Sequence, residues 1–310
     1  MLSRRNVRVK VMQQLYSLAQ DKELTFKHAL NAYFNTIQDS FRLYLLNLYC
    51  IVKVCSFAEE DFRIRSSKHI RSEEDKLFTD KIFSNELITS LVKNKKLNDL
   101  FQKEKCAEGL DDDLFRKIYK DFCKDEAYQK YLAKPSTNED HIEILLELYR
   151  FCRRNEVFNE IMDDRFACWT DDKSLVIGAL KKTLKILPQD GAIYAEHIPD
   201  DDTVVHFGQF LLETTYHQDQ ELESLIKPVL ENWDTERVAL IDMILIKMGI
   251  VEMVNFKTIP AKVTLNEYVE LSKTYSTDKS REFVNGVMDK LLKQLEAEGK
   301  IVKEGRGLNL

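Results

Sequence analysis

The chain of 310 residues is 44% hydrophobic and 32% charged, a composition that fits a folded globular protein and excludes a disordered chain. Its net charge of −6 and pI near 5.7 give no overall reason to expect a nucleic-acid ligand, although local patches decide such binding. Because only 9 Gly and 5 Pro interrupt the sequence, we predict an all-α fold.

The first predicted helix runs from Ser3 to about Ala19, with Ser3 as its N-cap. Helical spacing places four apolar residues on its buried face: Val7, Val11, Leu15 and Leu18. The first ten residues also carry four cations, and no acidic residue precedes Asp21: Arg4, Arg5, Arg8 and Lys10. This end of the chain is therefore a basic island on an acidic protein.

Cations in the first turns of a helix oppose its dipole, at a cost of about 0.3–1 kcal/mol each. Two interpretations remain open for these cations. In the first, they are a solvated charge run that water screens. In the second, a bound polyanion supplies the missing negative charge, since free N–H groups at a helix start suit phosphates.

The middle of the chain is predicted to be helical throughout. Leu43 to Phe57 is apolar enough for a buried helix and too short to span a bilayer, and it contains Asn47 and Lys53. Residues 139–150 and 171–187 are strongly periodic, and a turn follows at Pro188. The acidic run at residues 200–202 is interpreted as the cap of a helix that begins near Val204, in preference to a metal site.

From residue 204 onward the helices follow one another closely. A long apolar helix is predicted to end near Asn255, Pro260 prevents its continuation, and Thr264 to Glu267 forms a capping box for the next helix. The last helix carries two neighbouring apolar rows: Phe283, Val287, Leu291 and Leu295, and Val284, Met288 and Leu292. We expect an N-terminal bundle at residues 1–200, a C-terminal bundle at 201–298 and a mobile tail at 299–310.

No motif for catalysis or metal binding is present. The six cysteines include no C-x-x-C pair, the six histidines include no H-E-x-x-H, and no glycine-rich phosphate loop occurs. We therefore expect no enzyme activity, no cofactor, no metal and no membrane anchor. The thiols are expected to be reduced and mostly buried, as in a cytoplasmic protein.

Two segments resemble the NusB family of bacterial transcription antitermination factors. The C-terminal one starts with the stretch Trp233-Asp-Thr-Glu-Arg-Val-Ala-Leu-Ile-Asp242 and contains a helix, an Ile-Pro linker, an Asn-Glu-containing helix and a Phe-Val-Asn-Gly helix, in that order. The N-terminal one is the arginine-rich first helix, followed by Gln14-Leu15-Tyr16. The resemblance implies NusB-like helical bundles with additional inserted helices. It also implies a non-catalytic factor that binds boxA-type single-stranded RNA with the ribosomal protein NusE, and through them acts on the RNA polymerase elongation complex.

The resemblance also assigns residues. Arg4, Arg5 and Arg8 match the family's arginine-rich helix, Asn6 replaces a usual arginine, and Lys10 is expected to assist at the phosphates. RNA is further expected at Lys273 and Lys279, and at the rings of Tyr16 and Phe283, where base stacking contributes about 1–3 kcal/mol per base. Asp242 and Lys247 are expected to face NusE. Core packing remains the alternative for the two rings, and ordinary surface charge for Asp242 and Lys247.

The long middle departs from the family. More than a hundred additional residues separate the two matched ends, and they extend or replace part of the N-terminal bundle. A rival hypothesis is a helical protein–protein scaffold whose NusB-like module no longer binds RNA, which the acidic balance and Asn6 favour. An RNA-modifying enzyme is a weaker third class, because no cofactor motif follows the module.

Overall fold

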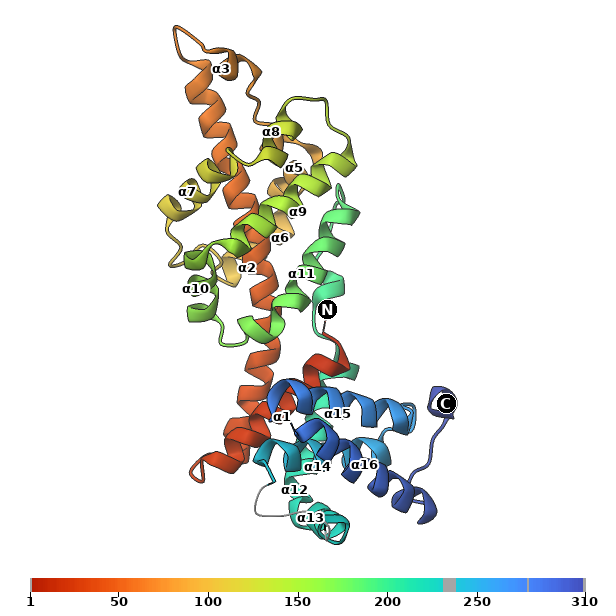
Figure 1. The fold of residues 1–310 in the computed structure, drawn as a ribbon. Coiled ribbons are helices and arrows are strands. Elements are labelled where there is room, and N and C mark those ends of the chain that lie inside the picture. Colours follow the sequence, from red (N-terminus) through yellow and green to blue (C-terminus); the bar gives the residue numbers. More distant parts are fainter. Residues whose placement is uncertain (1, 231–237, 278, 309–310) are drawn as a thin grey trace. The chain divides into compact units, whose positions relative to one another are not determined.

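The computed structural model describes residues 2–230, 238–277 and 279–308, and all regular structure in these residues is helical (Figure 1). The predicted all-α fold is thus confirmed. The chain forms two compact units: unit 1 holds residues 38–198, and unit 2 holds residues 2–37 and 199–310. This division differs from the expected one, because the first helix belongs to the unit of the C-terminal helices.

Unit 1 contains the part of α2 (Phe26–Ser66) that follows Gln38, and helix α9 packs against several of its shorter helices. The remaining elements are α3 (Glu73–Leu77), α4 (Lys81–Ser84), α5 (Glu86–Lys93), α6 (Lys95–Lys103), α7 (Asp112–Phe122), α8 (Glu126–Leu132), α9 (Asn138–Arg154), α10 (Glu156–Arg165), α11 (Trp169–Ile186) and the 3-10 turn η1 (Ala195–His197). The two periodic segments predicted at 139–150 and 171–187 correspond to α9 and α11. Five of the six cysteines are buried and all six are free thiols.

Helix α2 is much longer than the predicted apolar segment at Leu43–Phe57. It runs for 41 residues because no Gly or Pro interrupts it. Its length and a mean hydropathy of 1.4 over 18 residues would suffice to cross a membrane, but 72% of that window is buried inside the protein. Within it, Asn47 accepts a hydrogen bond from the Tyr149 hydroxyl on α9 at 2.9 Å. These contacts identify α2 as a core helix.

His197 in η1 titrates in a way that can be measured. Its ring is buried, its Nε2 lies 3.0 Å from the Thr183 hydroxyl on α11, and burial lowers its pKa from 6.5 to about 4. Between pH 6.5 and 4, His197 is therefore protonated in the unfolded chain but neutral in the folded unit. We expect unit 1 to lose stability as the pH falls through this range. The slope from this one residue is at most about 1.4 kcal/mol per pH unit.

The check is urea unfolding at several pH values in a Trp233→Phe background, so that the signal comes from buried Trp169 in unit 1. His197→Gln does not titrate, and its stability should depend less on pH than that of the parent chain. Equal pH dependence of the two proteins would contradict the assignment.

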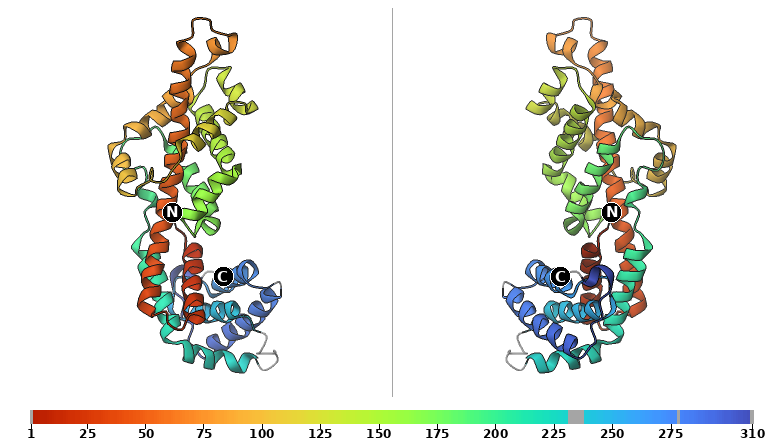
Figure 2. Two further views of the ribbon diagram at one scale, coloured as in Figure 1. Left: turned by 90° about the vertical axis from the view of Figure 1, so that its left-hand side faces the viewer. Right: turned by 90° about the vertical axis from the view of Figure 1, so that its right-hand side faces the viewer.

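Unit 2 gathers α1 with the C-terminal helices, and Figure 2 shows the helices of residues 240–297 grouped together. Helices α14, α15 and α16 pack against one another, and α1 packs on α14 and α12. The elements are α1 (Arg4–Gln20), the start of α2, the π-helical η2 (Asp202–Gln209), α12 (Phe210–His217), α13 (Asp219–Ile226), η3 (Lys227–Leu230), α14 (Leu240–Asn255), α15 (Ala261–Tyr275), α16 (Ser280–Ala297) and η5 (Gly305–Leu308).

The start of α1 explains the departure at Asn6. The Ser3 hydroxyl accepts the Asn6 N–H at 3.4 Å, and the Asn6 side chain accepts the Ser3 N–H at 3.2 Å. This reciprocal capping box satisfies two N–H groups that the helix leaves without partners. The predicted cap at Ser3 is confirmed. At Asn6, a side chain that caps the helix stands where the family usually has an arginine.

Of two other predicted N-caps in unit 2, the structure agrees with one and contradicts the other. Asp200 accepts the Thr203 N–H at 2.8 Å, as a capping residue does before η2. The capping box predicted at Thr264 to Glu267 is wrong, because α15 already begins at Ala261, directly after Pro260. Thr264 lies inside the helix, where its N–H bonds to the Pro260 carbonyl at 3.1 Å and its hydroxyl is free to serve another helix.

The apolar rows of α16 are buried as predicted, from Phe283 to Leu295. Beyond this helix, Lys303 donates hydrogen bonds to the Met253 and Phe256 carbonyls at 2.7 and 3.0 Å. The mobility expected for residues 299–310 stays a prediction. Residues 231–237, which include the start of the family-like stretch at Trp233, and residues 309–310 lie outside the described residues.

Candidate nucleic-acid interface

A buried ion pair joins the first helix to the C-terminal helices of unit 2. Arg8 on α1 donates from Nε and Nη2 to the two carboxylate oxygens of Glu252 on α14, both at 2.7 Å. Arg8 is 3% exposed and Glu252 is fully buried. Such a bidentate pair fixes the orientation of both side chains, since the planar guanidinium matches the carboxylate in geometry.

Two hydroxyl groups on α15 complete the coordination of Glu252. Thr264 donates to its Oε1 at 2.8 Å and Tyr268 donates to its Oε2 at 3.0 Å. Arg8 in turn lies with its Cζ 5.3 Å from the Phe207 ring centroid and 5.8 Å from that of Tyr268. The site thus holds α1, η2, α14 and α15 together through one carboxylate and one guanidinium.

The pKa values of this cluster follow from burial and charge. Burial alone would lower the pKa of Arg8, but the hydrogen bond and negative charge of Glu252 more than offset it and raise the pKa. Burial, with the charge of Glu252, raises the pKa of Tyr268 well above its ordinary value. Arg8 therefore stays charged and Tyr268 stays a hydrogen-bond donor.

Arg4 and Arg5, in contrast, lie at the surface of α1. Arg4 is 3.5 Å from Asp202 and Arg5 is 3.7 Å from Glu267, and all four side chains are at least partly exposed. Exposed pairs of this kind contribute about 0–1 kcal/mol. Both arginines can therefore exchange a carboxylate for another anion at little cost.

The structure corrects the accessibility expected of three residues. Arg8, Lys10 and Phe283 are all buried, so they are not surface groups that an RNA strand reaches. Arg8 is held by Glu252, because a cation inside a protein needs a nearby anion. Phe283 is part of the packed face of α16, which is the alternative that the sequence left open for it.

The other predicted RNA contacts are exposed. Tyr16 is 38% exposed on α1, Lys273 lies in the last turn of α15, and Lys279 directly precedes α16. All three belong to unit 2, as do Arg4 and Arg5. The family resemblance thus selected residues of one compact unit, although 257 positions separate Tyr16 from Lys273.

An exposed ring that the sequence analysis did not assign to RNA extends this set. Phe210 at the start of α12 is 40% exposed, and its ring centroid lies 5.5 Å from that of Phe256. The ring centroids of Phe256 and Phe207 are 4.9 Å apart, and the Cζ of Arg4 lies 5.5 Å from the Phe207 centroid. A continuous cluster of three rings therefore connects a surface arginine to a surface phenylalanine.

The two residues expected to face a protein partner are engaged within unit 2. Asp242 is 3% exposed and accepts the Ser280 hydroxyl at 2.7 Å, which ties the start of α14 to the start of α16. Lys247 forms an ion pair with Asp219 on α13, and its side chain is 12% exposed. Asp242 is therefore internal, which corrects its expected surface position.

Glu252 and Tyr268, like Phe210, are residues of the candidate site that the sequence analysis missed. One pattern could have found Glu252, because it stands in a long apolar run on the predicted helix that ends at Asn255. An acid in such a run must have a buried cationic partner. No local pattern indicates that this partner is Arg8, which lies 244 positions away.

Comparison with known proteins supports the resemblance. The model of the NusB family matches residues 175–293, which include η2 and all the helices of unit 2 that follow it up to α16. The transcription antitermination protein NusB of Salinibacter ruber is 36% identical over 111 residues, which are 36% of this chain and 69% of that protein. No solved structure matches the chain.

Two further relatives named transcription antitermination protein NusB agree. That of Chloroherpeton thalassium is 40% identical over 89 residues, or 29% of this chain and 42% of the relative. That of Oleidesulfovibrio alaskensis is 38% identical over 93 residues, or 30% of this chain and 60% of the relative. The additional helices of unit 1 lie mostly outside the matched range, and the chain belongs to the NusB family.

Proposed function

We propose that this protein is a non-catalytic, cytoplasmic transcription antitermination factor whose unit 2 binds boxA-type single-stranded RNA together with a NusE-like ribosomal protein. The observation that supports it best is the exposed basic start of α1 within the same compact unit as the family-matched helices. The RNA polymerase elongation complex would be reached through these partners.

Phosphate contacts are assigned to four exposed cations in unit 2: Arg4, Arg5, Lys273 and Lys279. The partner of Arg4 is the exposed Asp202 at 3.5 Å, and that of Arg5 is the partly exposed Glu267 at 3.7 Å, so phosphate oxygens can replace both carboxylates. Arg8 contributes indirectly, since its pair with Glu252 holds α1 in place. Lys10 and Phe283 are assigned to the packing that supports this surface.

Base contacts are assigned to the exposed rings of Tyr16 and Phe210. Sequence-specific recognition of RNA uses single strands, whose unstacked bases offer faces and edges that an A-form helix hides. Aromatic side chains stack on such bases and contribute about 1–3 kcal/mol each. Phe210 is braced by Phe256 and therefore presents its ring in a fixed orientation.

A salt series on labelled boxA-type RNA, with and without the NusE-like protein, tests this proposal. About four phosphate contacts predict a slope of log K against log salt near −3, at about −0.7 per phosphate. Arg4→Ala/Arg5→Ala should weaken binding to all RNAs alike and reduce the slope to about −1.4.

Lys95→Ala/Lys96→Ala is the matched control, because it removes two adjacent exposed cations from α6 in unit 1. This control should keep the parent slope. An unchanged slope in the arginine variant would show that Arg4 and Arg5 do not contact the RNA phosphates. No RNA binding at low salt, even with the partner, would favour the helical scaffold instead.

A further inference from the structure

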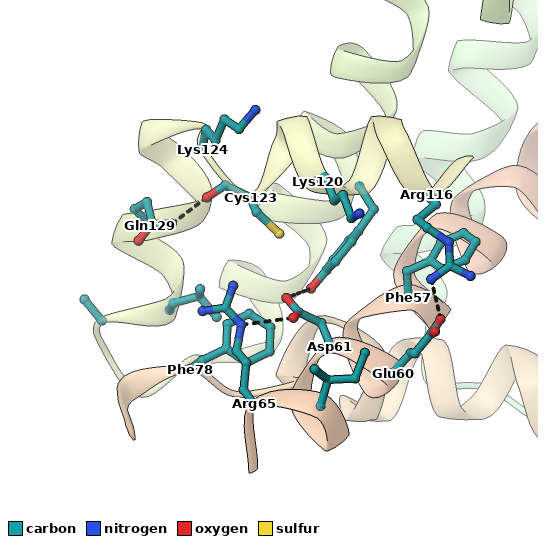
Figure 3. Close-up of a pocket in the computed structure, with 14 residues that line it drawn as sticks. Phe57, Glu60, Asp61, Arg65, Phe78, Arg116, Lys120, Cys123, Lys124 and Gln129 are labelled. Carbon is teal, nitrogen blue, oxygen red and sulfur yellow. Dashed lines mark hydrogen bonds and ion pairs between the residues drawn. The ribbon is translucent and has the colours of Figure 1, made fainter. Parts of the chain in front are cut away.

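Unit 1 contains a pocket of about 790 Å³ between the end of α2, α7 and α8 (Figure 3). Binding sites for small ligands commonly have about 300–1,000 Å³. The pocket lies in the part of the chain that the family match leaves uncovered. Nothing in the proposed RNA interface requires it, so its role can be argued from its own residues.

Two arginines in the pocket lie against phenylalanine rings. Arg116 on α7 has its Cζ 4.8 Å from the Phe57 centroid, and it donates from Nη1 to Glu60 at 2.8 Å. A guanidinium held by a ring and a carboxylate loses little conformational entropy when it binds an anion. Figure 3 shows this pair at one end of the pocket.

The second arginine is held in the same way. Arg65 near the end of α2 has its Cζ 4.5 Å from the Phe78 centroid and donates from Nε to Asp61 at 3.0 Å. The Tyr119 hydroxyl donates to the other oxygen of Asp61 at 3.4 Å. Both guanidinium groups are thus preorganised at the wall of one pocket.

Lysines give the pocket an excess of positive charge. Lys120 and Lys124 join the two arginines, and the acidic residues among the described lining residues are Glu60 and Asp61. Two further carboxylates pair with these cations from outside the lining: Asp75 lies 3.5 Å from Arg65, and Asp121 lies 2.8 Å from Lys124. Lys120 is exposed and forms no ion pair with the described residues. A positively charged concavity on a chain of net charge −6 indicates an anionic ligand.

The pocket also has an apolar side. Ile64 is 52% exposed, and the lining also includes Leu132 and Ala133 at the end of α8. A large aliphatic side chain that remains half in water gains free energy when a partner covers it. The ligand should therefore present an apolar group next to its negative charge.

We propose that this pocket binds an acidic peptide segment of a protein partner, in which an Asp or Glu stands next to an apolar side chain. RNA fits less well, because Phe57 and Phe78 are buried beneath the guanidinium groups and their faces are therefore closed to bases.

The test uses the full chain and an array of 12-residue peptides that combine Asp or Glu with Leu, Phe or Met in all registers. The same peptides with Asn and Gln in place of the acids serve as the uncharged set, and a 12-nucleotide oligo(U) serves as the RNA probe. We expect binding to a subset of the acidic peptides, weak binding to their amide versions, and no displacement by oligo(U).

Two variants locate the binding. Lys120→Glu/Lys124→Glu changes exposed pocket residues and should weaken peptide binding about 10-fold or more, since like charges then face each other. Lys117→Glu is the control, because it reverses one charge on the helix of Lys120 outside the pocket lining, and it should leave binding unchanged. The proposal is overturned if no acidic peptide binds, if amide versions bind equally, if both variants behave alike, or if oligo(U) binds at the pocket instead.

Discussion

Replacing Glu252 by Gln should destabilise unit 2 by about 3–5 kcal/mol, the usual cost of removing one partner of a buried ion pair. The substitution leaves the Arg8 guanidinium charged and buried, with one neutral oxygen in place of a bidentate carboxylate. It also weakens the hydrogen bonds from Thr264 and Tyr268, which both end on Glu252.

Hydrogen exchange of the amides in α1, α14 and α15 of the full chain measures this loss directly, as the free energy of opening those helices. Glu267→Gln is the matched control, because Glu267 also accepts from Arg8, at 3.3 Å, but is partly exposed. It should cost less than about 1 kcal/mol.

A double substitution separates the charge from the packing. Arg8→Met/Glu252→Leu removes both members of the pair, and apolar replacements of buried pairs are often neutral or stabilising. We therefore expect the double variant to be more stable than Glu252→Gln alone. If Glu252→Gln costs no more than the Glu267 control, the buried pair does not hold unit 2 together.

Gly208→Ala should destabilise unit 2 by about 3 kcal/mol, from overpacking of about 1–3 kcal/mol and the loss of one buried hydrogen bond. Gly208 lies in η2, and a Cβ atom there would overlap the Tyr33 hydroxyl oxygen and the Val7 Cγ1. The Tyr33 hydroxyl donates to the Val204 carbonyl at 2.8 Å, so moving the ring would break that bond. The close approach of α1, α2 and η2 thus depends on a glycine.

Gly178→Ala is the control, because a Cβ atom at that position in α11 meets no other atom within 4 Å. It should stabilise its helix by about 0.5–1 kcal/mol, as Ala exceeds Gly in helix propensity. The free energies of unfolding of both variants are measured by thermal and urea unfolding. Val7→Ala combined with Gly208→Ala should recover part of the loss, and a Gly208→Ala protein as stable as the parent would show that η2 can shift.

Helix α1 shows which features follow from local sequence and which do not. Its bounds, its cap at Ser3 and its buried stripe follow from local sequence, because capping and helical periodicity act over three or four residues. The sequence analysis, in contrast, grouped Arg8 with Arg4 and Arg5, and no local pattern indicated that Glu252 buries it.

The sequence by itself determined the all-helical fold, the bounds of α1, the positions of α9 and α11, the buried rows of α16 and a basic N-terminus within a NusB-like chain. Only the tertiary structure decided which of the cations remain at the surface, which compact unit receives α1, and that unit 1 forms a cationic pocket. The physical reason is that periodicity and capping are local, whereas burying Arg8 requires an anion, and the chain supplies it 244 residues away.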